Sequence, residues 1–144
     1  MADDDAWEGM LDRVLALTVL LGKDMATHLE RDDLNDSRAR IIWELGHRGP
    51  SKQAALAVAL DVTPRAITSL VDALATSGLV TREPHPTDRR ATLVTLTDRG
   101  EGVAQAFAIG HRNLARRLFA DVPKKQLQSF GAVLDHVLAR LPSG

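Results

Sequence analysis

The sequence predicts a mainly α-helical (α+β) protein in which a single β-hairpin lies between helices. Apolar residues recur three or four positions apart, as in amphipathic helices, through most of the 144 residues. Two short stretches, 79–82 and 91–97, are instead rich in Val, Leu and Thr, a composition typical of strands. The polar residues 83–90 between them contain two prolines, so we expect a hairpin tip there.

A first helix is expected close to the N-terminus. Residues 1–6 are predicted to be frayed, and from Trp7 to Leu29 apolar side chains follow one helical stripe. The charged residues 31–33 interrupt this stripe. We therefore expect one long amphipathic helix before the first break.

Two shorter helices are predicted next. Asp36 or Ser37 can cap the first of them, and Gly49-Pro50 ends it, because the residue before a proline avoids the helical region. Ser51 is predicted to cap the second, which stops at Asp61. The side chains expected to be buried are Ile41, Ile42, Leu45, Leu56, Ala57 and Leu60.

The helix that follows is the centre of the pattern. Thr63 occupies an N-cap position, and Pro64 the first helical position, where its missing N–H costs nothing. Its apolar stripe comprises Ile67, Leu70, Val71 and Leu74. Its opposite face carries Arg65, Ala66, Thr68, Ser69 and Ala73. A helix with an apolar back and a small, hydrogen-bonding front can enter the major groove of DNA.

Two long helices are predicted after the hairpin. Thr97 can cap the first, whose apolar stripe reaches Leu118. Pro123 opens the second, whose stripe reaches Leu141. The whole order is helix, helix, helix-turn-helix, two-stranded wing, helix, helix.

This order predicts a winged helix-turn-helix between long dimerisation helices. We assign residues 1–34 to an N-terminal dimerisation helix, 35–100 to the winged unit and 101–144 to C-terminal dimerisation helices, within one structural domain. A winged unit of this size cannot cover all the apolar helix faces, whereas a second copy of the chain would. A twofold axis would then place two wings and two recognition helices on one side.

Composition excludes several classes of protein. The chain has no cysteine, which rules out disulfides and thiolate zinc sites. The N-terminus is acidic where a signal peptide is basic, and no apolar run reaches membrane-spanning length, so we expect a cytoplasmic protein without a membrane partner. Residues 1–36 hold ten acids and three bases, and residues 37–144 nine acids and fifteen bases. The mildly basic remainder is compatible with a DNA-facing surface.

Several short patterns, taken in order, resemble the MarR family of bacterial transcriptional regulators, which are winged helix-turn-helix homodimers. The resemblance spans residues 38–102. Its most specific part is a D-x-R wing motif, followed by a strand and L-T-x-x-G. The segments that carry it are Leu56-Ala57, 68–74, 78–80, 86–90 and 96–100.

The resemblance implies roles for matching residues. Arg90 would enter the minor groove, with Asp88 steadying it, and Arg89 would contact phosphate or remain a solvated charge. The positions that match base and phosphate contacts in the recognition helix are Thr63, Pro64, Arg65, Thr68 and Ser69. Ser51, Lys52 and Gln53 would meet phosphate from a helix N-terminus.

The chain also departs from family patterns. Asp61 stands in the turn of the motif, where the family often has glycine, and aspartate tolerates the left-handed backbone expected there. None of the five histidines has a partner at H-x-x-x-H spacing, so we expect no metal site and no cofactor. The resemblance implies a small effector, in many members a phenolic or aromatic acid. His28 and Trp43 are the candidates to line its cleft.

The function expected from these observations is sequence-specific binding to a palindromic operator in double-stranded DNA. The protein would be a homodimeric repressor that a small ligand releases from DNA. The alternative is a winged-helix module that binds proteins and not DNA, because residues 51–99 hold only six bases against five acids. An enzyme is the least favoured class, since the sequence shows no nucleophile, acid-base pair or metal set.

Overall fold

The computed structural model describes residues 1–29 and 34–142, with the side chains of 26–29 left out. The described residues form six helices and three short strands. They divide into two compact units, Met1–Ile41 and Ile42–Gly144, each of which is described by itself below.

The first unit contains α1 (Ala2–Leu29) and the start of α2 (Asp36–Arg48). The prediction that residues 1–6 are frayed is wrong from Ala2 onward, because three aspartates, residues 3–5, lie in the first turn of α1. There their charge stabilises the positive end of the helix dipole. Along α1, large apolar side chains such as Trp7 and Leu11 are exposed.

Helix α2 begins with a cap that the sequence analysis placed one or two residues too late. The Oδ1 atom of Asn35 accepts the backbone N–H of Arg38 at 2.9 Å, so Asn35 is the capping residue and not Asp36 or Ser37. The helix ends at Arg48, before Gly49-Pro50, as predicted. Its predicted inward side chains, Ile41, Ile42 and Leu45, are buried.

The core of the second unit lies between the helix-turn-helix and the sheet. Helices α3 (Gln53–Leu60) and α4 (Pro64–Thr76) are separated by a three-residue turn, residues 61–63. Burial confirms the predicted stripes of both helices, and only Leu70 is half-buried. The buried side chains are Leu56, Ala57, Leu60, Ile67, Val71, Leu74, Leu79, Val80 and Val94.

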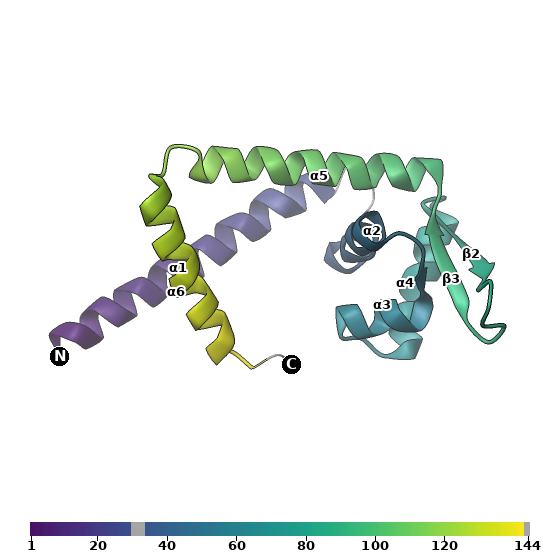
Figure 1. Ribbon diagram of the computed structural model, residues 1–144, viewed down its shortest axis with the longest axis horizontal. Coiled ribbons are helices and arrows are strands. Elements are labelled where there is room, and N and C mark those ends of the chain that lie inside the picture. Colours follow the sequence, from purple (N-terminus) through teal and green to yellow (C-terminus); the bar gives the residue numbers. More distant parts are fainter. Residues whose placement is uncertain (30–33, 143–144) are drawn as a thin grey trace. The chain divides into compact units, whose positions relative to one another are not determined.

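The sheet has three antiparallel strands in the order β1-β3-β2. Strands β2 (Val80–Pro84) and β3 (Thr92–Leu96) form the predicted hairpin, with Val80 opposite Leu96 and Pro84 opposite Thr92. They continue beyond the short β1 (Ser51–Lys52) as the wing (Figure 1). The winged helix-turn-helix prediction is confirmed, with one strand more than the expected two.

The extra strand corrects the role predicted for Ser51. Ser51 pairs with Val94 in the sheet, and its hydroxyl donates to the Gly49 carbonyl at 2.9 Å. Lys52 occupies the N-cap position of α3 without a side-chain capping bond. Ser51 therefore does not cap α3, because the chain leaves α2 in an extended conformation that β3 can pair with.

The turn between α3 and α4 is closed by backbone hydrogen bonds. Asp61 has the expected left-handed conformation, with φ 54° and ψ 51°. The Val62 N–H donates back to the Ala57 carbonyl at 3.0 Å, the pattern of a Schellman cap. Thr63 then caps α4, accepting the Ala66 N–H at 3.1 Å, and Pro64 opens it, as predicted.

The L-T-x-x-G segment joins the wing to α5 (Asp98–Phe119) at a tightly packed junction. Thr97 caps α5 by accepting the Gly100 N–H, and its hydroxyl donates to the Gly78 carbonyl at 2.6 Å. Gly100 is buried, and a Cβ atom there would overlap the Leu79 carbonyl oxygen. The motif is therefore explained by packing, since only glycine lets α5 approach Leu79, in the segment between α4 and β2, so closely.

Helix α6 (Lys124–Arg140) follows Pro123, as predicted. It contains no buried residue, and Phe130 contacts Phe119 of α5, with ring centroids 6.5 Å apart. Within the described ranges no single helix is long and apolar enough to span a membrane, although the bent pair of α3 and α4 together reaches that length and composition. The large apolar side chains exposed on α6 are Leu127, Phe130, Val133, Val137 and Leu138.

Candidate nucleic-acid interface

Helix α4 presents a small polar surface opposite its buried residues. Arg65 and Ser69 are exposed on this surface, as a groove-reading role requires. Thr63 and Pro64 are exposed at its N-terminal end. These four residues lie together because the cap and the proline set the first turn of the helix, and the apolar stripe sets its rotation.

Thr68 and Gln53, two other predicted contacts, are bound to each other. The Gln53 side-chain amide donates to the Thr68 hydroxyl at 3.0 Å, and that hydroxyl donates to the Pro64 carbonyl at 2.9 Å. Thr68 is exposed and Gln53 half-buried. The pair ties the start of α3 to α4, a use that the sequence analysis did not assign to them.

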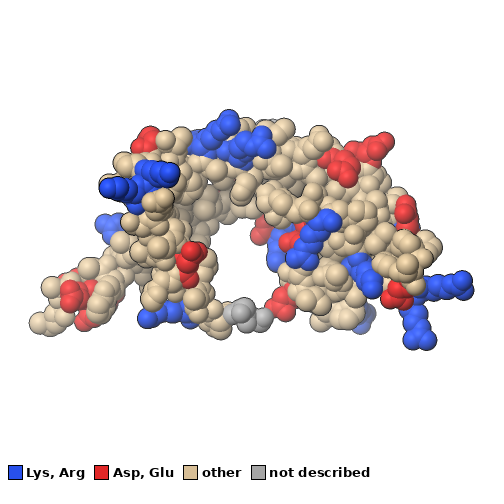
Figure 2. Space-filling view, in the orientation of Figure 1, with Lys and Arg blue, Asp and Glu red and all other residues tan. Residues whose placement is uncertain are grey.

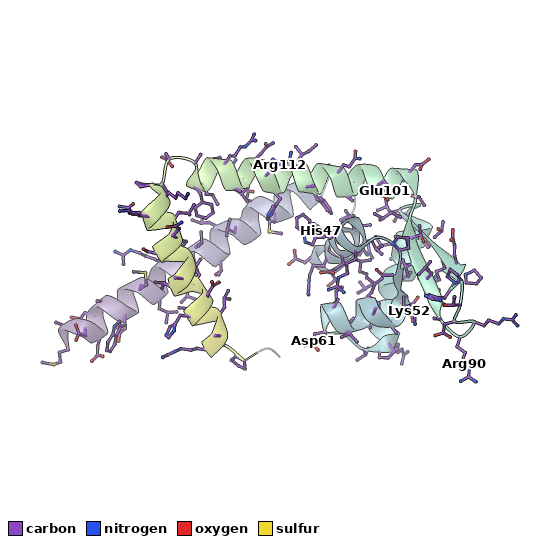
Figure 3. All side chains as sticks on the ribbon, viewed as in Figure 1. His47, Lys52, Asp61, Arg90, Glu101 and Arg112 are labelled. Atoms are coloured by element: carbon purple, nitrogen blue, oxygen red, sulfur yellow. The ribbon has the colours of Figure 1, made fainter. Side chains whose placement is uncertain are left out.

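The wing tip is shaped by Asp88. Its Oδ1 atom accepts the backbone N–H of Arg90 at 3.1 Å, and its Oδ2 atom lies 3.5 Å from the Lys52 ammonium. Arg89 and Arg90 are exposed, and Arg90 extends away from the protein at the tip of the hairpin (Figure 3). Asp88 therefore steadies the backbone at Arg90 and not its guanidinium, a refinement of the role implied by the wing motif.

A histidine for which the sequence predicted no metal-binding role also shapes the tip. The Nδ1 atom of His85 accepts the backbone N–H groups of Thr87 at 3.2 Å and of Asp88 at 3.0 Å. Accepting at Nδ1 requires the ring to be neutral, with its proton on Nε2. The sequence Pro84-His85-Pro86 predicts a turn but does not predict these hydrogen bonds.

Arg82 is a second residue of this surface that the sequence did not single out. It lies on β2 and reaches both helices of the motif: Nε donates to the Gln53 Oε1 atom at 3.2 Å, and Nη2 to the Thr68 carbonyl at 3.2 Å. The same Nη2 atom lies 2.6 Å from the Asp72 carboxylate. We call Gln53, Thr68, Asp72 and Arg82 the wing clamp.

The exposed cations of this surface come from several elements. Figure 2 shows Lys and Arg side chains extending from the wing tip, with few acids beside them. Exposed Asp61 and Glu83 reduce the local positive charge. The surface is therefore suited to a few directed phosphate or groove contacts and not to a broad polyanion track. Apart from Arg82 of the wing clamp, its exposed cations are Lys52, Arg65, Arg89 and Arg90.

Trp43, one of the two residues predicted to line an effector cleft, lies at a small pocket between α2 and α5. Its ring is 4.2 Å from that of His47 and 5.0 Å from that of His111, between centroids. The side chain of His28, the other candidate, lies outside the described residues. The pocket is lined by Trp43, Gly46, His47, Glu101, Ala104, Gln105 and Ala108.

Comparison with known proteins agrees with this arrangement. The model of the MarR family matches residues 34–92. The HTH-type transcriptional regulator ML2140 of Mycobacterium leprae is 31% identical over 107 residues, covering 74% of this chain and 73% of its own. The HTH-type transcriptional repressor IacR of Pseudomonas putida is 28% identical over 119 residues, covering 83% of this chain and 71% of its own.

A solved structure supports the same fold. The FabT protein of Streptococcus pneumoniae, crystallised in complex with DNA, superposes with a TM-score of 0.86 over 92% of this chain and 95% of its own, at 15% identity. Together with the wing motif and the observed helix-turn-helix, these similarities establish that the chain belongs to the MarR family of helix-turn-helix transcriptional regulators.

Proposed function

We propose that this regulator is a homodimer that binds a palindromic DNA operator and represses transcription until a small ligand releases it. The observation that carries the proposal is that one compact unit presents two candidate DNA-reading elements, the helix α4 and the wing tip. Arg65 and Ser69 face outward from α4, and Arg89 and Arg90 from the wing tip. A helix in the major groove and an arginine beside it in the minor groove would read adjacent parts of one site.

The DNA contacts are tested by a binding series at several salt concentrations. The probe is a duplex selected from a random library by the unaltered protein. Arg90→Ala is expected to weaken binding by roughly 1–3 kcal/mol. Arg48→Ala, which removes the same charge at the end of α2, is the control and is expected to leave affinity nearly unchanged. Equal affinities for the Arg90→Ala variant and the unaltered protein would contradict the assignment.

Homodimer formation is supported by the exposed apolar faces of α1 and α6. Trp7 is 67% exposed and Leu138 64% exposed, and such surfaces are rarely left to solvent when they are contiguous. A twofold dimer would present two recognition helices about 34–36 Å apart, the spacing of successive major grooves. Sedimentation equilibrium at micromolar concentration should give a mass near twice the 15.6 kDa of one chain.

Release by a small ligand is supported by the pocket at Trp43. Indole and imidazole rings offer stacking surfaces to an aromatic ring, and Glu101 and Gln105 offer hydrogen-bond acceptors. A phenol fits this lining better than a carboxylate, because its hydroxyl can donate to Glu101. Phenol should quench the fluorescence of Trp43 in a Trp7→Phe background and lower affinity for the selected duplex. Benzoate should be less effective. Quenching without loss of DNA affinity would show that phenol binds in the pocket, but would exclude release from DNA by a ligand bound there.

The near-neutral charge of residues 51–99 favours one alternative, a winged module that binds a protein. The two functions differ in salt dependence. A DNA-binding dimer loses affinity steeply with salt, with a slope of about 0.9 per phosphate contact on logarithmic axes. Absence of any shifted DNA at low salt would favour the protein-binding alternative.

A further inference from the structure

We propose that Arg82 is a positioning residue that fixes the angle between the wing and the recognition helix, and so sets the sequence specificity of DNA binding without contacting DNA. This inference rests on the proposed DNA-binding function. It concerns a residue that lies outside both DNA readers, on the strand that leads to the wing tip.

The contacts of Arg82 connect three elements through one rigid group. From β2, its guanidinium bonds to the Gln53 side chain on α3 and to the Thr68 carbonyl on α4. The Asp72 carboxylate, one helical turn beyond Thr68, accepts the shortest of these contacts, at 2.6 Å. A planar guanidinium with several fixed donors can satisfy these partners together, whereas a lysine ammonium concentrates its charge at a single atom.

The second half of the clamp passes through Gln53. Its Oε1 atom accepts from Arg82 while its Nε2 atom donates to Thr68, which closes a ring of hydrogen bonds between α3, α4 and β2. Both polar ends of the Gln53 amide are thereby used within the protein. The phosphate contact expected for Gln53 is therefore disfavoured. Its hydrogen bonds instead favour a role in holding the two helices against the wing.

The location of the clamp explains why it would act on geometry more than on stability. The side chains of Arg82 and Asp72 are 31% and 60% exposed, and ion pairs at such positions contribute little to folding. The sheet is three-stranded as far as Leu93, which pairs with both Lys52 and Glu83, and beyond it the Pro84–Thr92 pair and the tip residues 85–91 form a short two-stranded ribbon. Such a ribbon twists easily unless side chains fix it at its base.

Specific binding needs both readers to reach their grooves at once. When the wing is fixed, contact by α4 places the wing arginines at high effective concentration beside the minor groove. When the wing can rotate, that advantage is lost for the specific site. Non-specific binding depends mainly on phosphate charge and is unaffected. Loss of the clamp should therefore lower the ratio of specific to non-specific affinity.

The test measures that ratio for a duplex selected by the unaltered protein and for the same duplex with scrambled half-sites. Arg82→Lys, which keeps the charge, is expected to lower the ratio roughly 10-fold, the order of one mismatched base pair. The salt slope should stay unchanged. Arg48→Lys is the charge-conserving control. An unchanged ratio overturns the proposal. Arg82→Gln removes the charge, and a salt slope reduced by about 0.9 in that variant would also overturn the proposal, because it would make Arg82 a phosphate contact.

Asp72→Asn tests the clamp from its other side and leaves Arg82 in place. It should also lower the ratio, and combining it with Arg82→Lys should add little, because both changes break the same connection. Glu83→Gln removes an equal charge from exposed β2 outside the clamp, and should raise affinity for both duplexes alike. If the free-energy effects of Asp72→Asn and Arg82→Lys on this ratio were additive, the two residues would act independently and the clamp would be overturned.

A measurement without DNA separates this inference from the proposed function. The chain has no cysteine, so spin labels can be attached at Thr76→Cys on α4 and Arg89→Cys at the wing tip. The distance distribution between the labels should be narrow in the otherwise unaltered chain and broader with Arg82→Lys. Equal widths overturn the clamp. If the unaltered protein fails to prefer its selected duplex, the DNA-binding proposal fails while this measurement still decides the role of Arg82.

Discussion

The winged unit and the terminal helices of this chain use their apolar residues in opposite ways. In α3, α4 and the sheet, the apolar stripes are buried against one another, and Ile67, Val71 and Leu74 are almost inaccessible to solvent. In α6 no residue is buried, and Leu138 is 64% exposed. Since similar side chains at similar helical spacing have such different surroundings, periodicity predicts which face of a helix is apolar but not what covers it.

The largest expected difference between the two regions is the effect of removing one apolar side chain. Ile67→Ala should lower the free energy of unfolding by about 2–5 kcal/mol, because it leaves a cavity in the winged core. Phe130→Ala on α6 should chiefly raise the dissociation constant of the dimer. Sedimentation equilibrium over a range of protein concentrations separates the two, since only Phe130→Ala should dissociate into monomers at concentrations where the unaltered protein stays dimeric. A Phe130→Ala variant that is less stable but dimerises as tightly as the unaltered protein would show that Phe130 acts through its contact with Phe119 and not at the dimer interface.

Alanine substitutions at two glycines of α5 should differ in their effect on stability, because only one of the two glycines packs against the winged unit. Gly100→Ala places a Cβ against the Leu79 backbone and should destabilise the protein by about 1–3 kcal/mol. Gly102→Ala has no neighbour within 4 Å and should stabilise α5 by about 0.5–1 kcal/mol, through its higher helix propensity. Urea unfolding measures both. Equal effects at the two positions would contradict the close approach at Gly100.

The wing tip tests whether the winged unit is ordered at its edge as well as in its core. His85→Ala removes the acceptor of the Thr87 and Asp88 N–H groups, which water can then replace. DNA affinity should fall by about 0.5–1.5 kcal/mol, the usual net contribution of a hydrogen bond, while unfolding changes little. Asn at this position, which retains an acceptor, should restore part of the affinity. If His85→Ala and His85→Asn lowered DNA affinity equally, the hydrogen-bond acceptor at this position would not be the cause of the loss.

The smallest expected effect lies in the turn of the motif. Asp61 adopts a left-handed conformation that glycine reaches without steric cost. Asp61→Gly should therefore stabilise the protein by up to about 1 kcal/mol, and Asp61→Ala should destabilise it by a similar amount. Urea unfolding at constant protein concentration measures the difference. Stabilisation by alanine would show that the charge of Asp61, and not its backbone, dominates at this position.

Several features were determined by the sequence alone because they depend on neighbours along the chain. The caps at Thr63 and Thr97 join residues three positions apart, and the stripe through Ile67 and Leu74 follows from helical spacing. The turn at Asp61 likewise depends on local backbone geometry. Together with the order of the helices and the wing motif, these local signals sufficed to predict the winged fold and its family.

Other features were decided only by the tertiary structure, because their partners are far apart in sequence. Ser51 joined the sheet through pairing with Val94, although a helix cap was the best local interpretation. Gln53 bonds to Arg82, which lies 29 residues away, so neither residue alone indicated a shared role. The sequence shows which side chains can face DNA, whereas the wing clamp that we propose to align them depends on how α3, α4 and β2 pack.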